Sequence, residues 1–197
     1  EQGIATAPVD VDNLVRRIPL LYKTPDGWLA SFGTQVLKVL AGADTYVIKT
    51  NQNGIEEVRV KGVPPAKVDS LGRKWVSWVT PHETTLQEMD VEGRFVFVGT
   101  NAAGILPQLA TPVGLLEPHY IQAALAESIL QPHSPYIPDY SLAAEVLIYV
   151  GTVSLIWLLI TKLGVIWGVL SALLLFSGTA YAGVQLIANG VLIDVVW

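Results

Sequence analysis

The residues with the clearest potential for chemistry follow a run of four apolar side chains at residues 95–98. Folds of the α/β class place ligands in glycine-bearing loops after buried strands. Further along the chain, His119 lies in the first turn of a predicted helix, and histidine changes charge near neutral pH. We therefore predict that the loop and this histidine contact a ligand, and the predicted residues are Gly99, Thr100, Asn101, Gly104 and His119.

These residues do not form a recognised catalytic motif. The loop is neither G-x-G-x-x-G nor a phosphate-binding loop with its Lys-Ser/Thr, and no serine occupies a nucleophile elbow. The chain has no cysteine, and no second histidine lies at metal-ligand spacing from His82. We predict no catalytic residues, no enzyme activity, no cofactor and no metal. A structural alternative for His119 is that it hydrogen-bonds a neighbouring carbonyl or caps its turn.

A second charged group lies near the N-terminus, where Asp10 and Asp12 precede Arg16 and Arg17. Carboxylates at this spacing could bind a hard metal ion, but the glycine and distal glutamate of an EF-hand are missing. The alternative is that each aspartate pairs with one of the arginines. We predict structural ion pairs for Asp10, Asp12, Arg16 and Arg17.

Periodicity predicts the elements that must position these residues. Residues 29–41 have a near-helical apolar period, and we expect the stripe of Phe32, Val36, Val39 and Leu40 to face the core. Residues 45–50 and 54–61 predict a β-hairpin, because Asn-Gly at 53–54 is a strong turn signal. Residues 118–130 predict a helix with Ile121, Leu125 and Ile129 on one face. With the continuous apolar strand at 95–98, the pattern indicates an α/β domain with a mixed, largely parallel sheet.

The last third of the chain is apolar enough to cross a lipid bilayer. A membrane-spanning helix needs about 20 predominantly apolar residues, and residues 142–161 and 165–187 each satisfy this length. Lys162 separates the two, at a position that suits a lipid–water boundary. We predict a transmembrane hairpin with a third span starting near residue 195, and domains at residues 1–140 and 141–197.

The predicted orientation of the hairpin in the membrane follows from the same lysine. Cytoplasmic loops are enriched in Lys and Arg, which places the turn at Lys162 inside and residues 1–140 on the extracytoplasmic side. A net charge of −5 provides no basic surface for DNA or RNA. We expect the lipid bilayer, and no nucleic acid, as a partner.

The order of these features resembles the C-terminal half of a CHASE2 domain, an extracytoplasmic sensory module of bacterial transmembrane receptors. The resemblance rests on Asp10, Asp12, Arg16, Arg17, Pro19 and Leu20, on Phe-Val-Phe-Val-Gly-Thr at 95–100 with Ala103 and Gly104, on Ala-Thr-Pro at 110–112, and on Pro118 with His119. It implies location in the bacterial inner (plasma) membrane and an effector such as a kinase or nucleotide cyclase. It also implies that the sheet is incomplete at its N-terminal side, with the missing half in the same or a cleaved chain.

Two functions are compatible with this pattern. The first is a signal-input region that senses an extracytoplasmic ligand or partner and acts through its membrane helices on an effector. The second is an accessory or structural subunit of a larger membrane complex, which docks through the small residues of the hairpin, Gly164, Gly168, Ser171 and Ala172. A homo-oligomer is compatible with either function.

Overall fold

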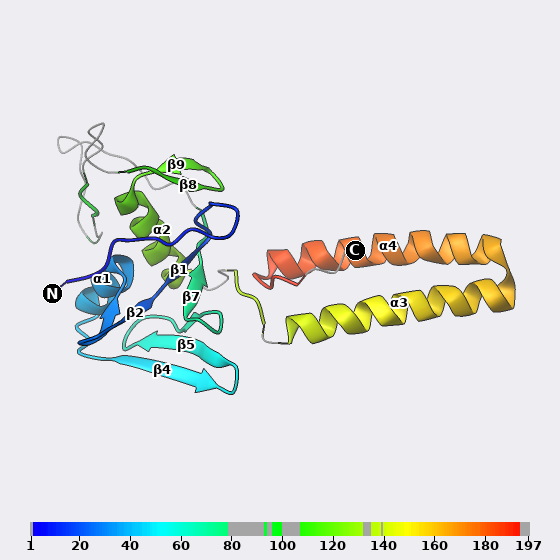
Figure 1. The fold of residues 1–197 in the computed structure, drawn as a ribbon, viewed down its shortest axis with the longest axis horizontal. Helices are drawn as coiled ribbons and strands as arrows, with labels where there is room; N and C mark the ends of the chain where they lie inside the picture. The colour runs from blue at the N-terminus through cyan, green and yellow to red at the C-terminus, as the bar shows by residue number, and fades with distance from the viewer. Residues whose placement is uncertain are drawn as a thin grey trace. The chain divides into compact units, whose positions relative to one another are not determined.

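The computed structural model of the chain divides into two compact units, residues 1–134 and 135–197, which are described separately. It describes residues 2–78, 93, 96–99, 107–131, 135–138 and 140–193. Figure 1 shows the first unit as a mixture of short strands and two helices, and the second as a pair of long helices.

The first unit contains nine strands and two helices among the described residues. The strands are β1 (Arg17–Pro19), β2 (Leu21–Thr24), β3 (Gly27–Ala30), β4 (Tyr46–Asn51), β5 (Gly54–Val60), β6 (Ala66–Lys67), β7 (Arg73–Trp75), β8 (Leu109–Thr111) and β9 (Gly114–Leu116). The helices are α1 (Phe32–Leu40) and α2 (Pro118–Leu130). The strands form small sheets in the orders β1-β7, β2-β3, β4-β5-β6 and β8-β9.

The β4–β5 hairpin confirms the turn predicted from Asn53 and Gly54. The two strands pair antiparallel from Tyr46 opposite Val60 to Asn51 opposite Gly54. Gly54 has φ of 132°, a conformation that residues with a Cβ rarely adopt. The backbone N–H of Asn53 donates to the side-chain oxygen of Asn51 over 2.8 Å, which closes the turn.

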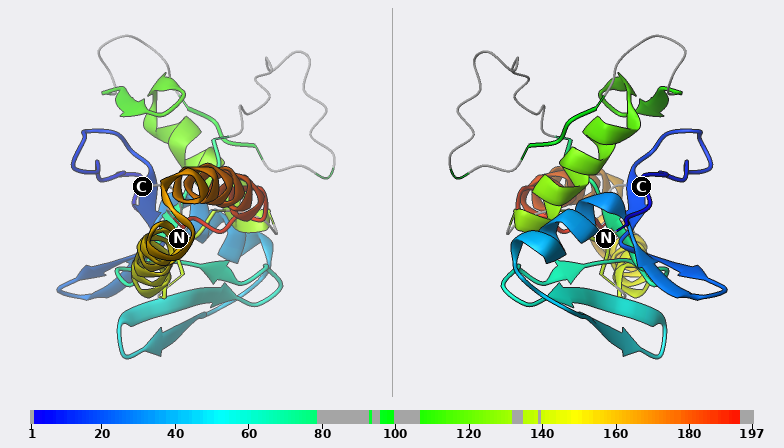
Figure 2. Two further views of the ribbon diagram at one scale, coloured as in Figure 1. Left: turned by 90° about the vertical axis from the view of Figure 1, so that its right-hand side faces the viewer. Right: turned by 90° about the vertical axis from the view of Figure 1, so that its left-hand side faces the viewer.

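Helix α2 lies beside α1 and supplies much of the core, as Figure 2 shows from two sides. Its residues Ile121, Leu125 and Ile129 are buried, which confirms the predicted apolar face. The two helices meet at Gly33, where a Cβ would lie 2.6 Å from the backbone oxygen of Gln122. The fully buried Gln122 accepts a hydrogen bond from the Gly33 N–H over 3.0 Å, so the close approach leaves no unpaired amide at this point.

The prediction that the apolar stripe of α1 faces the core is wrong. Phe32 is 38% exposed, Val39 55% and Leu40 57%, and Val36 is partly buried, whereas α1 buries Gly33, Thr34, Gln35 and Leu37. The reason is the crossing with α2, because the closest approach of two helices favours the face with the smallest side chain. Helical periodicity identified the helix but not the face that is buried.

The largely parallel sheet expected from the sequence is not confirmed. Every strand ladder in the described part of the chain is antiparallel. Residues 96–98, expected in a continuous buried strand, are not assigned to a strand, and Val96 and Val98 are 45% and 85% exposed. The expectation of a strand at these three residues is therefore wrong, although Phe97 is partly buried and packs against the core. Phe95 lies outside the described residues.

The second unit is a hairpin of α3 (Ser141–Leu163) and α4 (Val165–Ala188), each long and apolar enough to cross a membrane. Gly164 forms the turn with φ of 94°. The helices pack closely at Gly168, where a Cβ would lie 2.1 Å from Cγ1 of Ile160. Residues 191–193 are not helical, and the predicted start of a third span near 195 lies outside the described residues.

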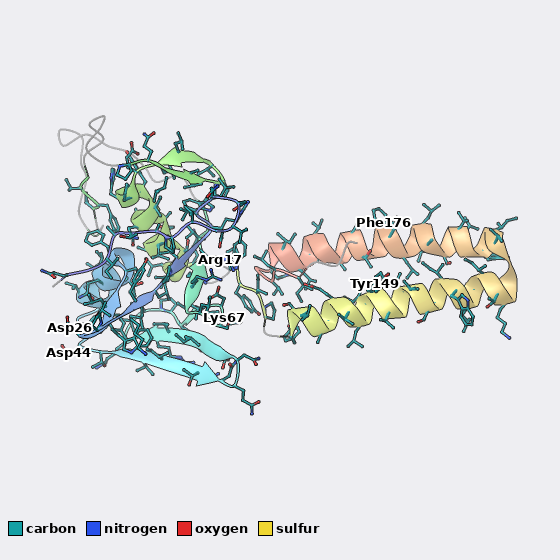
Figure 3. The ribbon with its side chains drawn as sticks, viewed as in Figure 1. Arg17, Asp26, Asp44, Lys67, Tyr149 and Phe176 are labelled. Atoms are coloured by element: carbon teal, nitrogen blue, oxygen red, sulfur yellow. The ribbon has the colours of Figure 1, made fainter. Side chains whose placement is uncertain are left out.

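The chain before α3 and the chain after α4 meet at the open end of this hairpin. Tyr136 donates its backbone N–H to the oxygen of Gly190 over 2.9 Å and accepts one from the N–H of Leu192 over 2.9 Å. The two ends are therefore held side by side. Figure 3 shows Tyr149 on α3 and Phe176 on α4 between this end and the Gly164 turn.

Candidate functional site

The structure brings together two of the predicted ligand-contact residues, Gly99 and His119. A Cβ added to Gly99 would lie 2.2 Å from Cγ of His119, far inside van der Waals contact. His119 is the second residue of α2, after Pro118, whose ring suits the first position of a helix. The other predicted residues, Thr100, Asn101 and Gly104, lie outside the described part of the chain.

The imidazole of His119 is half-buried. Its ring lies 4.4 Å from the ring of Tyr120, between centroids, at an interplanar angle of 37°. Its Nδ1 atom is buried and has no hydrogen-bond partner among the residues that the structure describes. The predicted alternative, in which this histidine donates to a carbonyl or caps its turn, is therefore not seen for Nδ1.

An aromatic contact joins the segment that carries Gly99 to α1. Phe97, two residues before Gly99, packs edge-to-face on Phe32 of α1, with 5.8 Å between the ring centroids. This contact ties residues 96–99 to α1, while the contact of Gly99 with His119 ties them to α2. The segment thus bridges the two helices of the first unit.

A carboxylate sets the electrostatic character of this region. Glu117 precedes α2, and Gln108 donates to its carboxylate over 2.9 Å. This hydrogen bond, together with the neighbouring backbone N–H and the charge of His119, lowers the pKa of Glu117 below its usual value. Glu117 is therefore ionised at neutral pH, so a carboxylate lies close to the imidazole at the start of α2.

The aspartate and arginine residues near the N-terminus form ion pairs. Asp12 pairs with Arg16, and Asp10 pairs with Arg17. The hydrogen bond from Arg16 lowers the pKa of Asp12. The side chain of Asp10 is 12% exposed and that of Asp12 is 46% exposed, so the two pairs differ in how well water screens them.

Sequence reasoning missed two members of the Asp10 network. Arg73 of β7 donates from Nε to Asp69 over 2.8 Å and lies 3.8 Å from Asp10, and Arg17 lies 3.6 Å from Asp69. Arg17 also stacks over Trp75, at 5.4 Å from the ring centroid. The antiparallel register of β1 with β7 brings these residues together, and that register could not be read from the sequence.

This network of Asp10, Asp69, Arg17 and Arg73, which we call the Asp10 clamp, stabilises the fold. Two carboxylates and two guanidinium groups balance in charge and join the loop at residue 10, β1, the turn at residue 69 and β7. No group of three or more His, Cys, Asp and Glu residues suited to a metal occurs in the described residues. Both carboxylates accept hydrogen bonds from the arginines, and the positive charge of the arginines repels a metal cation.

Comparison with known proteins identifies one family. The family model described as CHASE2 domain matches residues 1–166, which is most of the chain. No curated protein and no solved structure matches the chain.

Proposed function

Because the chain belongs to the CHASE2 domain family, we propose that it is the signal-input region of a bacterial membrane receptor. CHASE2 domains are extracellular sensory domains of membrane receptors. In this proposal residues 1–134 sense a ligand or partner outside the inner membrane. The α3–α4 hairpin then passes the change to an effector that lies outside residues 1–197. The chain itself conveys a signal and catalyses no reaction.

The observation that carries this proposal is the extent of the family match. It runs through the first unit, along the whole of α3 and past Gly164 into the start of α4. A sensory domain and an apolar helix are thus covered by a single match. This continuity supports a function in which the two units act together, because a ligand alters an output only through an element that differs between two states.

Within the first unit, we place the ligand contact at Gly99 and His119. The segment that carries Gly99 contacts both helices through Phe97 on Phe32 and through Gly99 on His119. A solute that displaced the imidazole would change the contact between this segment and α2. Because α2 ends at Leu130, ten residues before Tyr140, a shift of α2 acts close in sequence to the start of α3.

The test uses the full chain in lipid nanodiscs, with separate readouts for binding and for coupling. Pools of small solutes, namely sugars, amino acids and amines, are screened by thermal unfolding. The chain has no cysteine, so Leu142→Cys with Ile187→Cys gives a unique spin-label pair at the open end of the hairpin. The proposal predicts a solute that raises the unfolding temperature and shifts the distance distribution of this pair.

Variants assign the effect to the site. His119→Ala should abolish both responses, whereas Lys23→Ala, at an exposed position of β2, should leave them intact. A solute that stabilises the protein without moving the labels contradicts signal input while retaining ligand binding. An unchanged response of His119→Ala contradicts the assignment of the site.

A second candidate is an accessory subunit of a larger membrane complex or of a homo-oligomer. The exposed apolar side chains of α1, Phe32, Val39 and Leu40, favour it, because such residues are often covered in protein interfaces. An N-terminal half of the domain, in the same or a cleaved chain, is proposed as one such partner. This candidate predicts a stoichiometric protein partner after mild solubilisation of native membranes, and no response of the spin labels to any solute.

A further inference from the structure

A backbone bridge closes the open end of the α3–α4 hairpin. Tyr136, which precedes α3, donates its N–H to the oxygen of Gly190 and accepts a hydrogen bond from the N–H of Leu192, each over 2.9 Å. The pairing is that of a parallel β-bridge between Tyr136 and Val191. We call this arrangement of Tyr136, Gly190 and Leu192 the Tyr136 latch. Because one residue makes both hydrogen bonds, displacement of that residue breaks both.

On the α4 side, the latch is continuous with the cap of the helix. Gly190 donates its N–H to the oxygen of Ile187 over 2.9 Å. Val191 donates to the oxygen of Leu186, also over 2.9 Å. These are the two bonds of a Schellman motif, in which the residue after the C-cap has positive φ. Gly190 is buried and has φ of 75°. The backbone that binds Tyr136 is therefore fixed to the last turn of α4.

On the α3 side, the latch adjoins the first turn of the helix. The N–H of Ser141, the first residue of α3, donates to the oxygen of Pro138 over 3.0 Å. Pro138 is buried, and the rings of Pro135 and Pro138 fix φ on the two sides of Tyr136. The latch thus joins the start of α3 to the end of α4.

The two ends of the hairpin are held in different ways. At the far end, the chain itself connects the helices through Gly164, and Gly168 packs on Ile160. At the near end, two backbone hydrogen bonds hold them, and the net free energy of such bonds is of the same order as a coupling free energy between two sites. The latch is therefore the closure that a signal is able to open.

We propose that the Tyr136 latch is a conformational switch, closed in this structure and opened by movement of the first unit. The proposal rests on the proposed function in signal input. Along the chain, Tyr136 lies between the end of α2 at Leu130 and the start of α3 at Ser141, so a displacement reaches the latch before it reaches α3. A closed latch makes the hairpin one body, whereas an open latch frees α3 to move against α4. The latch supplies the element with two states that signal input requires.

Amide hydrogen exchange of the full chain in lipid nanodiscs tests whether the latch is closed without a stimulus. Tyr136 and Leu192 donate their N–H groups to the latch, whereas the N–H groups of Ile137 and Ile193 have no acceptor among the described residues. Because exchange requires a hydrogen bond to open, we expect the first two amides to exchange at least about ten-fold more slowly than the second two. Equal rates, after correction for intrinsic exchange, would overturn the proposal.

A proline substitution opens the latch in the absence of any solute. Leu192→Pro removes the donor to Tyr136, because proline has no N–H. The readout is the spin-label pair Leu142→Cys with Ile187→Cys at the open end of the hairpin. We expect Leu192→Pro to broaden the distance distribution of this pair and to shift it to longer distances. Ile193→Pro, which removes an N–H that the latch does not use, should leave the distribution unchanged.

A second variant opens the latch without removing a donor. Gly190→Ala keeps every N–H but places a Cβ at φ of 75°, which strains the cap of α4. It should move the labels in the same direction as Leu192→Pro. Gly178→Ala, whose Cβ meets nothing within 4 Å, should not move them. Unmoved labels in both Leu192→Pro and Gly190→Ala, or an equal shift in Ile193→Pro, would overturn the proposal.

Failure of the latch is distinguishable from failure of signal input. These measurements contain no solute, so unmoved labels reject the latch and leave ligand sensing to the solute screen. Conversely, a latch that opens in Leu192→Pro stands as a structural device even where no solute moves the labels, and the proposed function then fails alone.

Discussion

Gly99 and His119 lie so close together that no side chain fits between them. A Cβ on Gly99 would stand 2.2 Å from Cγ of the imidazole. Because Cγ is the ring atom nearest to the histidine backbone, rotation of the ring alone does not make room. The contact therefore requires glycine at position 99 for as long as position 119 carries an imidazole.

A double-mutant cycle tests this contact. Gly99→Ala should lower the free energy of unfolding of the full chain by about 1–3 kcal/mol, the usual range for an overpacked site. In an His119→Ala background the same substitution should cost less, because the ring that clashes is gone. Denaturant unfolding of the four proteins gives the coupling energy. Equal costs in the two backgrounds would show that the two residues do not interact.

The Asp10 clamp offers a comparison with a matched control. Asp10→Asn should lower the free energy of unfolding by about 3 kcal/mol, because it leaves Arg17 and Arg73 partly buried with one carboxylate fewer. Asp12→Asn, which breaks the exposed pair with Arg16, should change it by less than about 1 kcal/mol. Denaturant titration of the two variants side by side measures the difference. Similar effects of both would refute the clamp.

Burial of Lys74 in β7 lowers its pKa to about 8, and this shift predicts how stability depends on pH. Between pH 8 and 10.5 the unfolded chain binds more protons than the folded chain at this residue, so the free energy of unfolding should rise with pH. Below this window the buried charge costs about 3 kcal/mol, and Lys74→Met should recover an amount of that order. Thermal unfolding across the window, with Lys23→Met as control, checks both effects. A pH slope that survives in Lys74→Met would contradict them.

The hairpin supplies its own control for helix packing. Gly168→Ala places a methyl group 2.1 Å from Cγ1 of Ile160, whereas Gly178→Ala and Gly151→Ala meet nothing within 4 Å. We expect Gly168→Ala to separate α3 from α4 and to lower the detergent concentration at which the hairpin unfolds. The other two substitutions should leave this concentration unchanged or raise it, since alanine favours helix more than glycine does. A uniform effect of all three would mean that Gly168 is not a contact point.

Sequence patterns were most informative where one local signal decides the structure. Asn53 and Gly54 specify the β4–β5 hairpin through a turn that needs positive φ. The buried face of α2 follows from helical spacing, and length and composition identify α3 and α4 as helices able to cross a membrane. In each case the information lies within a single segment of the chain.

Where the structure depends on contacts between distant segments, the patterns were insufficient or misleading. The apolar stripe of α1 was expected in the core, but the approach of α2 at Gly33 selects another face. The roles of Asp69, Arg73 and Lys74 depend on the register of β1 with β7, which no local signal encodes. Gly99 and His119 lie in contact, but the ligand-binding role of these two residues and of Thr100, Asn101 and Gly104 stays a prediction.

The most direct test of the account is which side of the membrane each unit faces. The chain lacks cysteine, so Lys23→Cys in the first unit and Thr161→Cys near the Gly164 turn, which keeps Lys162, each introduce one thiol. A membrane-impermeant maleimide is applied to intact spheroplasts and then to permeabilised ones. The account predicts that the cysteine at position 23 is labelled from outside and the cysteine at position 161 only after permeabilisation. The reverse pattern, or recovery of the chain in the soluble fraction, would contradict an extracytoplasmic sensory unit on a membrane hairpin.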